Sequence, residues 1–295
     1  MYVMGVSTRK VTAVMEKLCG LEVSSTQVSR LSAELDGELD AFRNRPLGAY
    51  PYVFVDAQYQ KVRRDGAIRD LAVLIAVGVN AEGRREILGV STSLSEAEVH
   101  WRAFLGGLQQ RGLSGIELII SDDHAGLRKA RRALFPSVLW QRCQFHLAQN
   151  AQAYVPKVEM RAEVGQTIRD IWNAPNLDDA KLKLAKAVKD YARKAPELAK
   201  WMEENLEEGF TVFQFPRASW KKLRTSNALE RTNREVKRRT RVASLFPNEA
   251  SCLRLVTAVL QEIHEEWAVG RLYLAVPRKT TAVKPDQNIY RKRVA

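Results

Sequence analysis

The sequence has few of the features that mark a secreted or membrane protein. Its three cysteines, Cys19, Cys143 and Cys252, lie far apart and are odd in number, which argues against a disulfide scaffold and favours a reducing compartment. The longest apolar run, Leu71 to Val79, is far shorter than the roughly 20 residues that a membrane-spanning helix needs. No basic stretch followed by an apolar segment opens the chain, as a secretory signal would. We therefore expect a cytoplasmic protein with no membrane partner.

Acidic residues are scarce relative to basic ones. The chain of 295 residues carries 47 Lys and Arg against 34 Asp and Glu, a formal net charge of +13. Such an excess favours a polyanionic partner, most simply nucleic acid. An unspecialised basic protein of the cytosol is the alternative, and net charge alone does not reject it. The length is that of about two domains at roughly 150 residues each.

The order of predicted elements between residue 46 and about residue 145 indicates a mixed β-sheet. Three apolar strands come first, followed by a helix, a fourth strand, a helix and a fifth strand. Adjacent strands favour antiparallel hairpins, and the later alternation of strand and helix favours parallel pairing. Residues 146 to about 222 are helical and charged and interrupt this pattern, and two further helices follow. We expect an α/β fold with an all-α insertion.

The first 45 residues predict two short helices joined by a turn that contains Gly20. Ser24 or Ser25 can cap the second helix, which would run through Leu39. Two such helices form a candidate helix-turn-helix, although plain helix packing is an equally good interpretation. The residues that would face the edges of bases are Ser25, Gln27, Ser29 and Arg30.

Two aspartates are placed where predicted strands end. Asp56 follows the apolar strand Tyr52 to Val55, and Asp122 follows the strand Ile116 to Ile120 and one serine. A carboxylate at the end of a rigid strand is a good ligand for Mg²⁺. Either residue alone is better explained as a turn-forming Asp. Together, on the first and fourth strands of one sheet, they form a candidate pair.

A third acid, Glu230, lies near the start of a predicted helix that Ser226 caps. Helical spacing puts Arg234, Lys237 and Arg241 on the same face as this carboxylate. The usual meaning of such a pattern is a solvated helix with surface ion pairs. The density of Lys and Arg here favours the other meaning, a metal ligand followed by a row of cations that bind phosphates.

Three carboxylates brought to one place repel one another, and divalent cations relieve that repulsion. Two metal ions about 4 Å apart can activate water or a 3′-hydroxyl and stabilise the leaving oxygen of an in-line attack at phosphorus. The trio of acids therefore predicts hydrolysis or transesterification of phosphodiesters.

Five stretches of the sequence, in one order, resemble the Mutator-type transposase family of bacterial insertion sequences. The resemblance runs from the first residues to about residue 270. The stretches are Tyr52 to Tyr59, Ile120 to Leu127, Trp140 to His146, Thr225 to Asn233 and Arg238 to Leu255.

The resemblance implies a DDE transposase with an RNase H-like core, using Asp56, Asp122 and Glu230 as catalytic residues and as ligands of two Mg²⁺ or Mn²⁺ ions. It selects Asp122 over the neighbouring Asp123. It also implies cleavage and strand transfer at the terminal inverted repeats of an insertion sequence, with double-stranded DNA, including target DNA, as the partner. Action as a homo-oligomer on DNA in the bacterial nucleoid follows as a further expectation. The helix after Glu230 would contribute DNA-binding residues, namely Arg231, Arg234, Lys237, Arg238 and Arg241.

The expected organisation has five parts. Residues 1–45 form the helix-turn-helix-like segment, residues 46–146 and 223–270 the two parts of the RNase H-like core, and residues 147–222 the helical insertion. Residues 271–295 form a basic tail that can contact phosphates.

Cys143 and His146 form a Cys-x-x-His pair that the family also carries near its active site. The whole chain has only four His and three Cys, and no second pair with metal-ligand spacing is evident. We interpret the pair as structural or DNA-positioning, with zinc binding as the less favoured alternative.

Family members carry a further segment before the part that resembles residues 1–45, so we expect this chain to lack part of the apparatus that recognises element ends. The alternative function is therefore a truncated, non-cutting DNA-binding derivative that inhibits the full-length transposase. A general RNase H-like nuclease is a third, weaker possibility.

Overall fold

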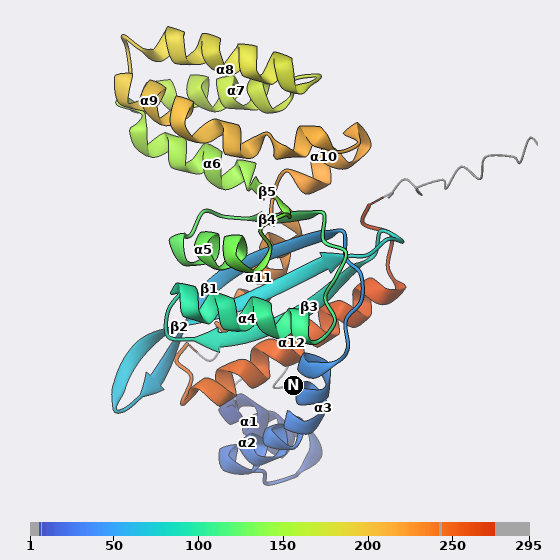
Figure 1. The fold of residues 1–295 in the computed structure, drawn as a ribbon. Coiled ribbons are helices and arrows are strands. Elements are labelled where there is room, and N and C mark those ends of the chain that lie inside the picture. The colour runs from blue at the N-terminus through green and yellow to red at the C-terminus, as the bar shows by residue number, and fades with distance from the viewer. Residues whose placement is uncertain (1–5, 7, 242–243, 275–295) are drawn as a thin grey trace, which may run out of the picture.

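The computed structural model describes residues 6, 8–241 and 244–274 (Figure 1). Most of the predicted basic tail, 271–295, lies outside these residues. Three helices come first: α1 (Thr8–Cys19), α2 (Ser25–Glu34) and α3 (Asp36–Asn44). No helix in the described part of the chain is long and apolar enough to span a membrane.

The predicted mixed sheet is confirmed. Its order is β3-β2-β1-β4-β5, in which β1 pairs antiparallel with β2 and parallel with β4. β2 and β3 are antiparallel, and β4 and β5 are parallel. The strands are β1 (Tyr52–Arg64), β2 (Ala67–Val79), β3 (Arg85–Ser93), β4 (Leu118–Ser121) and β5 (Leu139–Arg142).

The first strand does not end at Asp56, as the sequence pattern predicted, but continues to Arg64. Its second half keeps pairing with β2 up to the pair Arg64 and Ala67, so the backbone groups stay hydrogen-bonded although the side chains there are more polar. Asp65 and Gly66 close the hairpin with φ angles of 49° and 76°, the left-handed conformation that two-residue hairpin turns require. The change from apolar to polar residues marks the edge of the core and not the end of the strand.

Helices cover both faces of the sheet (Figure 1). On one face, α4 (Glu98–Gln110) and α5 (Ala125–Leu134) pack with Val53 and Val55 of β1 around the fully buried Trp101. On the other face, α11 (Asn227–Thr240) and α12 (Glu249–Val269) pack against Tyr52 and Phe54. Successive side chains of a strand alternate between faces, so β1 is buried on both sides.

The helical block between β5 and α11 has a hydrophobic cluster of its own, which spans residues 147–210 and includes Trp172, Tyr191 and Trp201. It lies at one end of the sheet, beyond β5 (Figure 1). Its helices are α6 (Gln144–Ala151), α7 (Arg161–Trp172), α8 (Leu177–Tyr191) and α9 (Pro196–Asn205). Short 3-10 turns, η1 (Gln152–Tyr154), η2 (Val158–Met160), η3 (Leu206–Gly209) and η4 (Thr211–Gln214), and the helix α10 (Arg217–Leu223) complete the connection.

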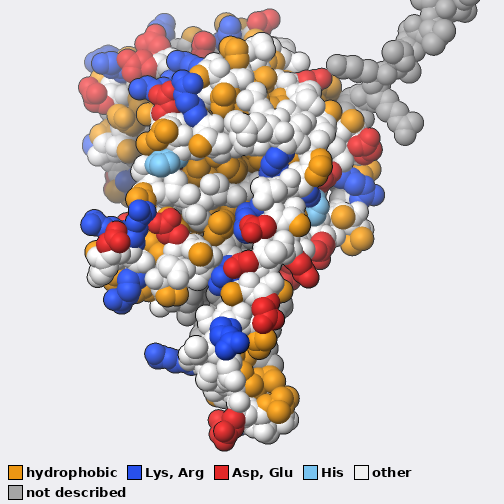
Figure 2. Space-filling model, turned by 60° about the horizontal axis from the view of Figure 1, so that its bottom comes forward, with side chains coloured by type: hydrophobic (Ala, Val, Ile, Leu, Met, Phe, Trp, Pro, Cys, Tyr) orange, Lys and Arg blue, Asp and Glu red, His pale blue; other side chains and the backbone are white. Residues whose placement is uncertain are grey.

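The second predicted N-terminal helix is two helices in the structure. α2 ends at Glu34, and α3 begins at Asp36 in a new direction. The cause is tertiary, because Arg254 of α12 donates two hydrogen bonds of 2.7 Å to the Asp36 carboxylate and Leu39 is buried. α3 is thereby docked on α12, while α1 and α2 project from the body and expose hydrophobic side chains (Figure 2).

Candidate active site

Two neighbouring parallel strands bring the predicted aspartates level with each other. Phe54 of β1 is the register partner of Ile120 of β4. Asp56 and Asp122 each lie two residues further along, and the alternation of side chains puts both on the face that α11 and α12 cover. The structure therefore brings together two acids that are 66 residues apart in the sequence.

Asp56 is fixed by two hydrogen bonds. Its Oδ1 accepts one from the Ala57 N–H at 2.9 Å, and its Oδ2 accepts one from Asn233 Nδ2 of α11 at 2.8 Å. Burial raises the pKa of Asp56 to about 6, and the negative charge of Asp122 adds to this rise, while the Ala57 N–H and His146 oppose it. The ionised carboxylate is thus costly here, and a cation placed beside it would relieve that cost.

Glu230 lies on α11 one turn before Asn233, and residues three apart share a helix face. Its Oε1 is buried and makes no hydrogen bond in the described part of the structure. Among the described residues, however, no three His, Cys, Asp or Glu side chains are spaced as a metal-binding cluster, so the three acids do not form a closed cage in this conformation. Glu230 therefore lies on the helix that contacts Asp56, but among the described residues it does not form one cluster with both aspartates.

The Cys-x-x-His pair lies between the start of α11 and the second aspartate. The Cys143 thiol is fully buried, and its Sγ accepts hydrogen bonds from the N–H and the Oγ–H of Ser226, each at 3.3 Å, at the start of α11. The hydrogen bond between His146 and Cys143 raises the pKa of His146 to about 9 in spite of its burial. His146 Nδ1 is 4.0 Å from Asp122 Oδ1. The pair therefore connects the helix that carries Glu230 to the second aspartate.

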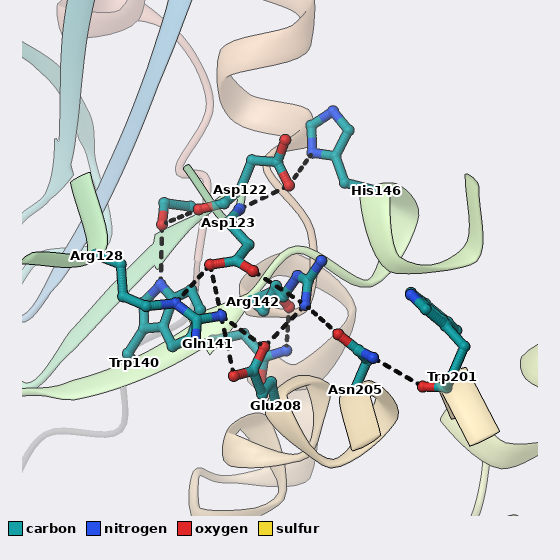
Figure 3. Close-up of polar contacts among 11 residues, drawn as sticks. Asp122, Asp123, Arg128, Trp140, Gln141, Arg142, His146, Trp201, Asn205 and Glu208 are labelled. Carbon is teal, nitrogen blue, oxygen red and sulfur yellow. Dashed lines mark hydrogen bonds and ion pairs between the residues drawn. The ribbon is translucent and has the colours of Figure 1, made fainter. Parts of the chain in front are cut away.

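Asp123 is engaged differently from its neighbour (Figure 3). Arg128 Nε donates to Asp123 Oδ1 at 2.6 Å, and Arg142 Nη1 lies 3.3 Å from Oδ2. Both arginines also reach Glu208, at 3.1 and 2.9 Å, and Arg142 donates to Asn205 at 3.1 Å. Asp123 is thus committed to a network that ties the end of β4 to the helical insertion, whereas Asp122 faces His146.

Sequence reasoning missed this network. Glu208 is 80 residues from Arg128 and 66 from Arg142 along the chain. Nothing in the local sequence of the η3 turn marks Glu208 as different from the other acids of the insertion. Only the packing of the insertion against β5 brings these charges together.

Gly126, at the start of α5, marks a close contact beside the site. A Cβ added at this position would lie 2.1 Å from the backbone oxygen of Glu96. We expect Gly126→Ala to lower the free energy of unfolding in urea by about 1–3 kcal/mol, because the backbone of Glu96 must move away. Gly106→Ala in α4 is the matched control, since nothing lies within 4 Å of its Cβ position. An equal loss in both variants would contradict this assignment.

The predicted DNA-binding residues are all on the surface. The four on α2, Ser25, Gln27, Ser29 and Arg30, are exposed, although the Gln27 side chain accepts a hydrogen bond of 2.7 Å from the Ser24 N–H in a capping box. The five on and after α11 are also exposed, and Arg238 among them is paired with Glu235 at 2.7 Å. These five are Arg231, Arg234, Lys237, Arg238 and Arg241.

Comparison with known proteins places the chain in a family. It is 55% identical over 276 residues to the transposase of insertion sequence IS406 from Burkholderia multivorans, which covers 93% of this chain and 71% of that protein. It is 43% identical to the transposase of ISRM5 from Rhizobium meliloti, over 93% of this chain and 69% of that one. It is 41% identical to the transposase of IS1081 from Mycobacterium tuberculosis, over 95% of this chain and 68% of that protein.

Among solved structures, one chain from the complex of a simian T-cell lymphotropic virus intasome with PP2A regulatory subunit B56 gamma is similar over 54% of this chain and 49% of that chain. The identity is 10% and the TM-score is 0.25, which is too low to establish a shared fold. The family model for transposases of the Mutator family matches residues 1–270. With most of its length matched by that model and by the transposases of several insertion sequences, the chain belongs to the Mutator family of transposases.

Proposed function

We propose that this chain is a DDE transposase that cleaves and joins DNA at the terminal inverted repeats of an insertion sequence. The observation that carries the proposal is the placement of Asp56 on β1 and of Asp122 directly after the adjacent parallel strand β4, with α11 bound to Asp56 through Asn233. Glu230 is the third acid in this proposal. The sheet order β3-β2-β1-β4-β5 supports an RNase H-like core.

The residues present suit the divalent ions that this chemistry needs. All three acids offer hard oxygen ligands, and the buried Glu230 Oε1 has no hydrogen-bond partner in the described structure, as expected of an atom that binds a cation. Two Mg²⁺ or Mn²⁺ ions would stabilise charge on the phosphate and activate water or a 3′-hydroxyl. Because the three acids do not form a closed cluster, the proposal requires Glu230 to approach the aspartates when metal and DNA bind.

The surrounding side chains have positioning roles in this proposal. Asn233 holds Asp56 Oδ2, and so ties β1 to α11. His146, which its contact with Cys143 favours in the protonated form, places positive charge beside Asp122. Residues 1–45 would then bind DNA, residues 46–146 and 223–270 would form the catalytic core, and residues 147–222 an insertion. Assembly as a homo-oligomer on the paired element ends is part of the same proposal.

Metal removal tests this function. The chain is incubated with a linear duplex that ends in the inverted repeats flanking its gene, in Mg²⁺, in Mn²⁺ or in EDTA. We expect strand cleavage in either metal and none in EDTA, with DNA binding retained throughout. Cleavage that persists in EDTA would contradict the proposal. Binding without cleavage in any metal would support the inhibitor alternative, and equal cutting of unrelated duplexes or RNA–DNA hybrids would indicate a general nuclease.

A further inference from the structure

A cavity of about 620 Å³ lies between α11, α12 and the start of β3, on the side of α11 that faces α12. Five arginines line it, together with two acids and Trp267. The arginines are Arg85, Arg231, Arg234, Arg238 and Arg239, and the acids are Glu235 and Glu266. We call this space the Arg85 cavity.

Two of the five arginines are already neutralised. Arg238 Nη2 lies 2.7 Å from Glu235 Oε1, and Arg239 binds both Glu235 and Glu262, at 2.7 and 2.8 Å. Hydrogen bonds from Arg238 and Arg239 lower the pKa of Glu235 to about 2, which keeps it ionised. Arg238 and Arg239 are therefore held in place by carboxylates that already balance their charges.

The other three arginines have no such partner. Within the described residues, Arg85, Arg231 and Arg234 make no ion pair with an acid, and Glu266 lies beyond ion-pair distance of them. Arg85 is partly buried, and burial together with the positive charge of Arg231 lowers its pKa. A partly desolvated cation such as Arg85 that faces other cations without a counter-charge marks a place where an anion would be stabilised.

Arg85 is also held in one orientation. Its guanidinium carbon lies 4.2 Å from the ring centroid of Trp267 and 4.6 Å from that of Tyr273. Aromatic faces attract the guanidinium but cannot accept its in-plane N–H groups, so these donors stay available at the edge of the stack. A planar fork of donors fixed in this way suits the oxygens of a phosphate.

We propose that the Arg85 cavity binds a backbone phosphate of the DNA substrate. This inference rests on the proposed function, in which DNA is the substrate. Arg231 and Arg234 follow Glu230 by one and four residues, which is about 1.5 and 6 Å along the axis of α11. Their side chains line the cavity on the side of α11 that faces away from Asn233, so a phosphate held there belongs to a part of the DNA outside the aspartate site. Arg85 was not a candidate on sequence grounds, because a single Arg at a strand start carries no signal.

The test measures duplex binding in EDTA, so its result does not depend on cleavage. We expect Arg85→Ala and Arg231→Ala each to weaken binding about fivefold at 0.15 M salt and to reduce the log–log salt slope by about 0.9, the effect of one lost phosphate contact. Arg85→Lys should keep the slope but not the full affinity, because it retains the charge and loses the planar fork. Arg102→Ala is the control, since Arg102 is paired with Glu98 on α4.

Duplexes with one neutral methylphosphonate locate the contact. We expect one position at which the substitution weakens binding by the wild type but not by Arg85→Ala.

Unchanged affinity and slope in both Arg85→Ala and Arg231→Ala would overturn the proposal, as would an equal change in Arg102→Ala. Arg231 is exposed, so its variant keeps the test valid if Arg85→Ala does not fold. If the wild type did not cleave in either metal while Arg85→Ala and Arg231→Ala still showed reduced salt slopes, the result would count against the proposed catalytic function alone.

Discussion

Alanine at Asp56 is expected to reduce metal-dependent DNA cleavage and strand transfer at least about a thousandfold, which corresponds to about 4 kcal/mol of transition-state stabilisation. Asp56 is held by Ala57 and Asn233 at the level of Asp122, so its loss removes one of two adjacent carboxylates that would hold the metal ions. The dissociation constant for duplex DNA should change less than about twofold, because the acid contributes nothing to the electrostatic attraction of phosphates. Cleavage rates under single-turnover conditions and binding in EDTA measure the two quantities separately.

Asp70→Ala is the matched control for this variant. Asp70 lies on the neighbouring strand β2 and is exposed, where it pairs with Lys61 at 2.7 Å. It should cleave at the wild-type rate. Asp122→Asn and Glu230→Gln should resemble Asp56→Ala, while Asp123→Asn should lose far less activity because Asp123 binds Arg128 and Arg142. Cleavage by Asp56→Ala at a rate near wild type would remove the basis of the triad.

Replacing Arg142 by alanine is expected to lower the free energy of unfolding by about 3–5 kcal/mol, the usual cost of removing one partner of a buried ionic network. The Arg142 side chain is only 6% exposed and lies between Asp123, Glu208 and Asn205. Its removal leaves two carboxylates facing each other with Arg128 as their remaining cation. Unfolding in urea, followed by circular dichroism, measures the change.

Lys194→Ala is the control for Arg142→Ala. Lys194 pairs with Glu163 at 2.8 Å in the same helical block, but both side chains are largely exposed, so we expect no measurable shift of the urea midpoint. Glu208→Gln should lie between the two, since it keeps hydrogen-bond acceptors for Arg128 and Arg142. A urea midpoint of Arg142→Ala equal to that of the wild type would show that the network does not stabilise the fold.

Local patterns in the sequence were sufficient to predict the order of the main secondary-structure elements. The alternation of apolar runs and helical periodicities predicted a mixed sheet, a charged helical block and two final helices, because each of these patterns reports which side chains are buried. Asp56 and Asp122 could be singled out because each follows a run of apolar residues in the sequence. The resemblance of five short motifs added the choice of Asp122 over Asp123, which stays a prediction. In the structure the two residues have different partners, His146 for Asp122 and Arg128 for Asp123.

Other features needed the tertiary structure. β1 continues past Asp56 because pairing with β2 satisfies its backbone, and α2 and α3 separate because Arg254 draws Asp36 onto α12. The charges around Asp123 and the cations around Arg85 come from segments far apart in the chain, and long-range contacts leave no periodic trace in a single sequence. The sequence by itself determined which residues are apolar, charged or strand-forming and hence the elements and the candidate acids. Only packing decided which charges meet, because the energy of a charge depends on the neighbours and the burial that the fold supplies.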